Sequence, residues 1–529
     1  MVMTDMTTGP RNAAQPGCLD QMHASMQEHL QDHIQEHLQD HIQERTQTQR
    51  QDHAPPLEPN PFRLPDWAAW WQQRAPLIQR VSAVVKFGRV QSVVGALVRA
   101  SVPGARMGEL CRLSEPAESG PCAAVATGVN TDDAAAARSS AYPLCWVVGF
   151  SGESALLMPM GELDRVSTRT LVQATGAVFS LRPHASMCGR VLSGLGRPLD
   201  DKGDLVEGDG AYSVIRDAPN PMTRRTDAAP FLTGLRAIDG VLTCVRGQRV
   251  GIFAAAGGGK STLLGMIAKG AAADVIVVAL IGERGREVRD FIERVLGPDL
   301  MTRTVIVCAT SDRSAMERVS AAYVATTIAE YFRAQGGNVL LVMDSLTRFA
   351  RAQREIALAA GEPAARRGFP PSVFARLPQL IERAGADATG GAITAFYTVL
   401  VEGDDMTEPV ADEARSLLDG HLVLSAKLAA QGHYPAIDVP ASASRMMGLV
   451  AGYRQRQASR RLRAILTRYD NLELLIRMGE YQKGVDPADD EAVERRADVL
   501  SFLQQERVEP SDLKKTVSAL AAAVGDITE

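Results

Sequence analysis

The stretch AAAGGGKST, at residues 254–262, constrains the fold of this chain more than any other. It fits the phosphate-binding pattern G-x-x-x-x-G-K-[ST], except that Ala254 stands in place of the first glycine. Such a loop works between a strand and a helix, because its backbone N–H groups and the helix N-terminus must face the phosphates together. The flanking segments VGIFA and STLLGMIA predict that strand and that helix. We therefore predict a nucleotide site, with a small residue tolerated at the strand end.

Several residues of this loop are expected to touch the nucleotide. The three glycines let the backbone wrap closely around the phosphates, Lys260 supplies a positive charge to them, and the Ser261 hydroxyl can ligate Mg²⁺. The residues predicted to bind the nucleotide here are Ala256, Gly257, Gly258, Gly259, Lys260, Ser261 and Thr262.

Strand-like and helix-like segments alternate over residues 186–450. Expected strands cover residues 250–254, 274–281, 304–309 and 339–343, and expected helices cover residues 261–269, 286–295 and 315–334. This alternation predicts a parallel α/β core. A charged, helical pattern over residues 451–529 predicts a C-terminal helical domain.

Two acidic residues follow apolar strands of this region. Asp344 ends NVLLVMD, where a carboxylate would orient Mg²⁺ and its water ligands. Glu283 follows ALIG, where a carboxylate beside the phosphate loop could polarise an attacking water. The structural alternatives are a helix cap for Asp344 and a surface charge at a helix start for Glu283.

The N-terminal part of the chain has a different composition. Residues 1–64 are rich in Gln, His and Pro and include the repeat HLQDHIQEHLQDHIQE, which is typical of a solvated low-complexity arm. Histidines four residues apart could alternatively bind a metal ion, although such ligands need a closed geometry. Short β-branched runs broken by Gly and Pro predict a small all-β domain over residues 65–185, with a surface insertion at 114–142.

Composition limits the classes of function. A net charge of −5 offers no basic footprint, so no nucleic-acid partner is expected. The seven cysteines form no C-x-x-C pair, which favours free thiols in a reducing compartment. We see neither a secretory signal nor an apolar run long enough to cross a membrane, and we expect a cytoplasmic protein.

Longer segments of the chain resemble the catalytic-subunit family of rotary ATPases and their protein-export relatives. The resemblance rests on GRVLSGLGRPLD (189–200), on residues 251–293 around the loop, on residues 343–385 and on GHYPAIDVPASASRM (432–446). Within that family, RFARAQREI and GFPPSVFARLPQLIERAG resemble the type III secretion ATPases, both flagellar and injectisome, and GGGKST is more similar to the injectisome branch. The implied fold is a RecA-like P-loop core with an N-terminal β-barrel domain and a C-terminal helical domain.

The resemblance also implies roles for single residues. Lys260 and Ser261 match the phosphate-loop lysine and the Mg²⁺ ligand. Glu283 matches the catalytic glutamate, Arg284 a γ-phosphate contact and Asp344 the Mg²⁺-orienting aspartate, which acts through water. In SASRM, Arg445 matches an arginine finger that reaches the neighbouring subunit's site, with a structural ion pair as its alternative. In HYPAID, Tyr434 matches the aromatic residue near adenine, with a core tyrosine as its alternative.

The activity that the resemblance implies is Mg²⁺-dependent ATP hydrolysis that energises protein export, through chaperone release and substrate unfolding. It implies a homohexamer, peripheral to the inner membrane, with stator and stalk proteins, an export gate and chaperone–cargo complexes as partners. Ala255 replaces a glycine usual in the family, and its methyl group could weaken nucleotide binding.

Two other classes of protein stay open at this point. One is a non-catalytic, structural nucleotide-binding subunit, which would lack the carboxylate that Glu283 supplies here. The other is an RNA translocase of the transcription-termination type, which would need an RNA-binding N-terminal domain.

Overall fold

The structure is a computed structural model that describes residues 86–115, 142–225, 229–255, 257–402, 405–507 and 509–525. The predictions for the histidine-rich arm and for Ala256 lie outside the described residues, as does most of the expected insertion at 114–142.

The first six strands close into a barrel. Its strand order is β1-β2-β5-β4-β3-β6, and all the neighbouring strands are antiparallel. Alternate residues of β3 point inward, so that Cys111 and Leu113 join Val98 and Leu157 in a fully buried core. The closed barrel confirms the N-terminal β-barrel domain that the resemblance implies, whereas the short β-branched runs by themselves predicted only an all-β domain. Its strands are β1 Phe87–Val94, β2 Leu97–Ser101, β3 Glu109–Ser114, β4 Leu144–Ser151, β5 Ser154–Pro159 and β6 Leu171–Val178.

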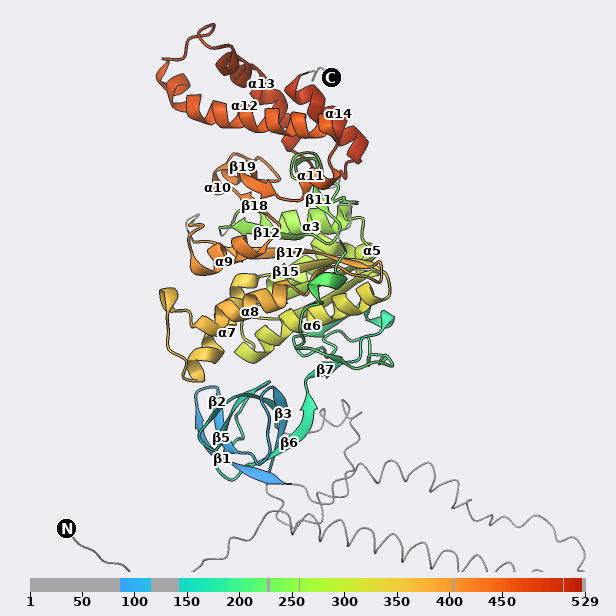
Figure 1. The fold of residues 1–529 in the computed structure, drawn as a ribbon, viewed down its shortest axis with the longest axis vertical. Coiled ribbons are helices and arrows are strands. Elements are labelled where there is room, and N and C mark those ends of the chain that lie inside the picture. Colours follow the sequence, from blue (N-terminus) through green and yellow to red (C-terminus); the bar gives the residue numbers. More distant parts are fainter. Residues whose placement is uncertain are drawn as a thin grey trace, which may run out of the picture. The chain divides into compact units, whose positions relative to one another are not determined.

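A largely parallel sheet forms the centre of the next part of the chain. Its order is β19-β18-β12-β17-β15-β13-β14-β8, in which the edge strand β19 is antiparallel and a short strand, β16, pairs with β17. Figure 1 shows β18, β12, β17 and β15 following one another. The strands are β8 Val191–Ser193, β12 Arg249–Ala254, β13 Val275–Ile281, β14 Thr304–Ala309, β15 Asn338–Asp344, β16 Gly385–Ala386, β17 Ala392–Leu400, β18 Gly420–Leu424 and β19 Ile437–Ser444. Two small sheets pair β7 Ser180–Leu181 with β9 Tyr212–Ser213, and β10 Pro230–Phe231 with β11 Cys244–Val245.

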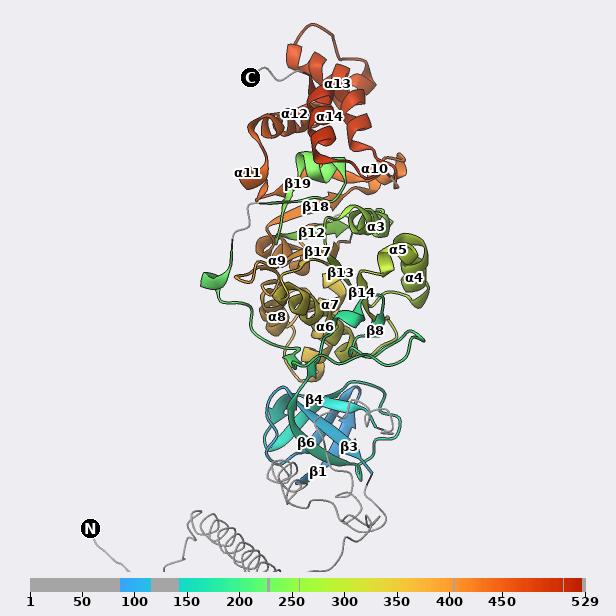
Figure 2. The same cartoon turned by 90° about the vertical axis from the view of Figure 1, so that its right-hand side faces the viewer.

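Helices cover both faces of this sheet, which confirms the predicted α/β core (Figure 2). One apolar core takes Leu341 and Met343 of β15, and the other takes Leu340 and Val342, because neighbouring residues of a strand point to opposite faces. The helices are α3 Lys260–Gly270, α4 Gly285–Asp290, α5 Gly297–Met301, α6 Ala315–Ala334, α7 Leu346–Ala359, α8 Pro371–Ile381, α9 Pro409–Leu417 and α10 Ala426–Ala430. The helix expected at 286–295 differs, because α4 passes into a π-helical segment, Phe291–Leu296.

Four further helices follow the sheet and confirm the expected C-terminal helical region. They are α11 Met447–Val450, α12 Tyr453–Met478, α13 Pro487–Leu503 and α14 Leu513–Val524. Leu462 and Ile465 of α12 and Val499 of α13 are buried together in the same apolar core as α3. Within the part of the chain that the structure describes, no helix combines the length and the apolar character needed to cross a membrane.

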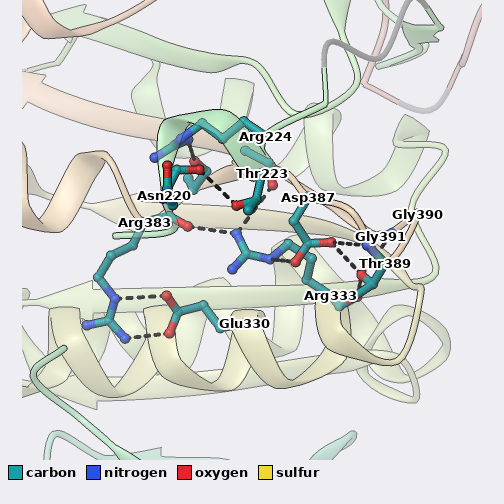
Figure 3. A network of polar contacts seen from close by, with 12 residues as sticks. Asn220, Thr223, Arg224, Glu330, Arg333, Arg383, Asp387, Thr389, Gly390 and Gly391 are labelled. Atoms are coloured by element: carbon teal, nitrogen blue, oxygen red, sulfur yellow. Dashed lines mark hydrogen bonds and ion pairs between the residues drawn. The ribbon is translucent and has the colours of Figure 1, made fainter. Parts of the chain in front are cut away.

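A network of ion pairs lies at the edge of the sheet where β15 and β17 begin (Figure 3). The guanidinium of Arg383 donates to Glu330 of α6 at 2.6 and 3.0 Å, and both side chains are fully buried. Arg216 also pairs with Glu330, at 2.8 Å. Arg333 pairs with Asp387 at 2.9 Å and donates to the carbonyl of Arg383 at 2.8 Å. These contacts join the end of α6 to the segment that follows α8.

Replacing Arg383 by Met should destabilise the protein by about 3–5 kcal/mol, because the substitution leaves the buried Glu330 carboxylate with one partner fewer. Urea unfolding followed by circular dichroism measures the loss. The control is Arg289→Met, which removes an exposed partner of Glu293 and should change the unfolding midpoint little. Equal shifts in the two variants would contradict the prediction.

Candidate nucleotide-binding and catalytic site

The loop that follows β12 has the backbone conformation expected of a phosphate-binding loop. Gly257 and Gly259 have φ values of 82° and 80°, a region that favours glycine, and Gly259 leads directly into α3. Ala254 is the buried last residue of β12, as its place in the motif predicts. Among the described residues, Arg367 is the one non-glycine residue with a positive φ. Ala255 therefore adds its methyl group without left-handed backbone strain.

The structure brings three of the predicted site residues together. The ammonium Nζ of Lys260 lies 2.6 Å from Oδ1 of Asp344 and 3.4 Å from Oε1 of Glu283. All three side chains are largely buried, and Glu283 and Asp344 are only 7% and 4% exposed. One cation thus lies between two buried carboxylates at the start of α3.

Strand register explains why residues so far apart in sequence meet. β13 and β15 are parallel neighbours with Leu280 opposite Asp344, so Glu283 emerges just beyond the same edge as Asp344. β12 ends at that edge as well, since Ala254 lies opposite Leu400 of β17. The loop and both carboxylates therefore share the carboxyl edge of the sheet, where ligands of open α/β sheets bind.

Two residues that the sequence analysis missed complete this cluster. Arg348, in the first turn of α7, donates to Oε2 of Glu283 at 3.4 Å and also to the carbonyl of Gly282. Thr398 of β17 donates from its hydroxyl to Oδ1 of Asp344 at 2.7 Å. Each residue carried a signal: Arg348 follows Asp344 by one helical turn, and Thr398 is a polar residue inside the apolar strand AFYTVL.

The environment of Glu283 changes its acidity. Burial raises the pKa of Glu283 to about 7; the positive charges of Lys260 and Arg348 oppose this rise, whereas the Asp344 carboxylate adds to it. A carboxylate whose pKa lies near neutrality is suited to act as a general base, which accepts a proton from water during a reaction.

The other residues that the sequence analysis predicts to contact the nucleotide lie beside the loop. The ring of Tyr434 packs on Gly259, where an added Cβ would lie 3.2 Å from Cε1 of the ring. The carbonyl of Tyr434 accepts a hydrogen bond from the backbone of Gln505 at 2.9 Å, and 38% of the residue stays exposed. Ser261 is exposed and Thr262 is half-buried at the start of α3. An aromatic ring, two hydroxyl side chains and the helix N-terminus thus border one loop.

Two predicted residues lie apart from this cluster. The side chain of Arg284 is 81% exposed and its nearest acidic partner is Glu287, at 3.8 Å. Arg445 follows Ser444, which pairs with Gly420 at the start of β18. The other end of β18, Leu424, lies beside Ala254 at the start of the phosphate loop. Arg445 is therefore at the far edge of the sheet from its own phosphate loop.

Comparison with known proteins identifies the type of nucleotide-binding domain. The family model described as ATP synthase alpha/beta family, nucleotide-binding domain, matches residues 234–444. A second model, the T3SS EscN ATPase C-terminal domain, matches residues 451–522. Together with the loop and the acidic cluster, these matches define the chain as a P-loop ATPase of the ATP synthase alpha/beta type.

Curated relatives and solved structures define the family more closely. The chain is 48% identical over 441 residues to a type 3 secretion system ATPase of Xanthomonas euvesicatoria, covering 83% of this chain and 95% of that protein. It is 43% identical over 449 residues to a flagellum-specific ATP synthase of Bacillus subtilis, covering 85% and 98%. The assembled ATPase EscN of enteropathogenic E. coli matches with a TM-score of 0.75 and 42% identity, covering 83% of this chain and all of that one. The chain belongs to the type 3 secretion system ATPase family, and it is an ATP-hydrolysing enzyme.

The pKa of Glu283 gives a prediction for the pH dependence of ATP hydrolysis. Because the carboxylate form is the one that can act on water, the rate should rise as pH increases through about 7. Arg348→Ala should move this rise to higher pH, because the positive charge of Arg348 lowers the pKa of Glu283, and Arg348→Lys should move it less. Steady-state phosphate release across the pH range measures both effects. A rate that is the same on both sides of neutrality would contradict the prediction.

Proposed function

We propose that this chain is the Mg²⁺-dependent ATPase of a type III secretion apparatus of the injectisome branch, and that it works as a ring of identical subunits. The observation that carries the proposal is the placement of Lys260 between Glu283 and Asp344 at the mouth of the phosphate loop. A non-catalytic nucleotide-binding subunit would have no use for the first of these carboxylates. The chain is 48% and 49% identical to two type 3 secretion system ATPases, against 43% and 45% to two flagellum-specific ATP synthases, which supports the injectisome branch.

The residues present suit a magnesium ion. Ser261 offers a hydroxyl oxygen and Asp344 a carboxylate at the same edge of the sheet, and Mg²⁺ prefers oxygen ligands with several waters retained. Ser261 would bind the ion directly and Asp344 through water. When bound, the ion neutralises charge on the β- and γ-phosphates during transfer.

Each residue of the cluster has a task in hydrolysis. Lys260 exchanges its carboxylate partners for phosphate oxygens when ATP enters, which frees Glu283 to hold the attacking water. The loop amides of residues 257–262 cradle the phosphates, and Tyr434, whose ring packs on Gly259, stacks on the nucleotide base. Arg284, exposed beside Glu283, is free to turn toward the γ-phosphate.

The position of Arg445 supports a site shared between subunits. Along β18 and β12 the phosphate-loop end and the Arg445 end are separated by four residue steps, about 13 Å at the usual rise of a strand. Arg445 is exposed at that far end, and its guanidinium donates to the carbonyl of Arg415 at 3.3 Å. It can therefore serve the site of a neighbouring copy but not its own, as an arginine finger does.

The assembly and its partners follow from relatives. The EscN structures are titled as an assembled ATPase and as a complex with its central stalk EscO. By analogy this chain forms a homohexamer that contacts a stalk protein, with stator proteins, the export gate and chaperone–cargo complexes as further partners. It would act in the cytoplasm, at the inner-membrane secretion apparatus, and release chaperones and unfold exported proteins there.

We propose a division of labour along the chain. The proposed divisions are the low-complexity, His- and Gln-rich segment 1–64, the barrel domain 65–185 with its insertion at 114–142, the ATPase domain 186–450 and the C-terminal domain 451–529. The barrel domain favours ring assembly and stator binding, and the C-terminal domain faces the export gate and cargo.

Mixing two inactive variants tests the shared site. Glu283→Gln and Arg445→Ala should each abolish hydrolysis while nucleotide binding persists. Mixed in equal parts, they should regain activity at about a quarter of the interfaces, where an intact Glu283 meets an intact Arg445 from the next subunit. Phosphate release by the mixture, assembled over a concentration series, measures the recovery.

The matched control is the double variant that carries both substitutions, assembled alone at the same total concentration, and it should stay inactive. No recovery from the two single variants, in rings shown to assemble, would contradict an arginine finger that acts in the neighbouring subunit.

A further inference from the structure

We infer that Thr398 is a positioning residue for Mg²⁺·ATP, because its hydroxyl fixes the orientation of the Asp344 carboxylate. The inference rests on the proposed function, in which Asp344 orients the metal's water ligands. Thr398 lies on β17, the strand between the strand of the phosphate loop and the strand of Asp344.

The contact is short and fully enclosed. The Thr398 hydroxyl lies 2.7 Å from Oδ1 of Asp344 and 3.3 Å from the carbonyl of Met343, and no part of Thr398 is exposed. A hydroxyl has one proton to donate, and a carboxylate oxygen accepts it more strongly than a peptide carbonyl. The hydrogen bond to Asp344 is therefore the principal one.

The two carboxylate oxygens of Asp344 have different partners. Oδ1 of Asp344 receives both the Thr398 hydroxyl and the ammonium of Lys260. No donor among the described residues bonds Oδ2, so this oxygen can receive the water ligands of a metal ion. When Lys260 turns to the phosphates, Thr398 is the donor that remains on Oδ1 and prevents the carboxylate from rotating.

The chain contains a comparison residue on the same strand. Thr394 is also fully buried on β17 and, being four residues away, points to the same face of the sheet. Its hydroxyl accepts from the backbone N–H of Gly247 at 2.9 Å, near the opposite edge of the sheet. Of the two buried threonines on β17, Thr394 thus bonds a backbone N–H, whereas Thr398 bonds the carboxylate of Asp344.

The test measures how much Mg²⁺ strengthens nucleotide binding. For the full chain, the dissociation constant of a non-hydrolysable ATP analogue is determined with Mg²⁺ and with EDTA. The value in EDTA divided by the value in Mg²⁺ measures how much the metal strengthens binding. Thr398→Val keeps the shape but removes the donor, and should reduce this ratio about tenfold, the size expected for a hydrogen bond to a charged group. Thr398→Ser should restore the ratio to near that of the parent protein.

Controls separate this effect from a general loss of stability. Thr394→Val should lower the melting temperature about as much as Thr398→Val does but leave the ratio unchanged. An unchanged ratio in Thr398→Val, with the ratio lost in Asp344→Asn, would overturn the inference alone. An unchanged ratio in Asp344→Asn would instead overturn the metal-binding role in the proposed function.

Two further outcomes are decisive. If Thr398→Ser loses as much as Thr398→Val, the packing of the side chain rather than its hydroxyl is responsible, and the inference is wrong. If Thr398→Val does not fold, Thr398→Ala removes the same donor and is judged by the same ratio. In hydrolysis assays the Mg²⁺ concentration at half-maximal rate should rise more than the maximal rate falls.

Discussion

The ammonium of Lys260 between two buried carboxylates is the interaction on which the site depends. Glu283 and Asp344 are nearly inaccessible to water, and two such charges side by side would repel strongly without a cation between them. Removing charges from water costs free energy even when they are paired, so this arrangement contributes little to the stability of the fold. In the proposed mechanism, phosphate oxygens replace the carboxylate partners of Lys260, and Asp344 turns to the water ligands of a metal ion.

The two edges of the sheet have different tasks. The carboxyl edge collects the loop, both carboxylates, Arg348 and Thr398, whereas the opposite edge has the ion pairs of Arg383 and the exposed Arg445. The antiparallel strand β19 connects them, since it follows Tyr434 at one edge and ends just before Arg445 at the other. With Arg445 as the proposed arginine finger, one subunit would contribute half of a site at each edge, which is the geometry that a closed ring of identical copies requires.

Sequence patterns predicted the elements well and the contacts only in part. The limits of α6, the strands β12 and β14 within one residue, and the α/β alternation follow from local periodicity. The helix expected at 286–295 contains a π-helical segment that no periodic pattern indicates, and the concern over Ala255 could not be settled before its backbone conformation was known. Arg348 and Thr398 were missed, because 65 residues separate Arg348 from Glu283 and 54 separate Thr398 from Asp344.

The sequence by itself determined the chemistry: a glycine-rich loop with Lys260 and Ser261, an acid at each of two strand tips, and family resemblance strong enough to assign roles. Local spacing carries that information, since a phosphate loop is a continuous segment whose residues act together. Only the tertiary structure decided which side chains share a partner and which edge of the sheet each one occupies. Register between parallel strands sets both, and it depends on the packing of the whole sheet between its helices, which no short segment encodes.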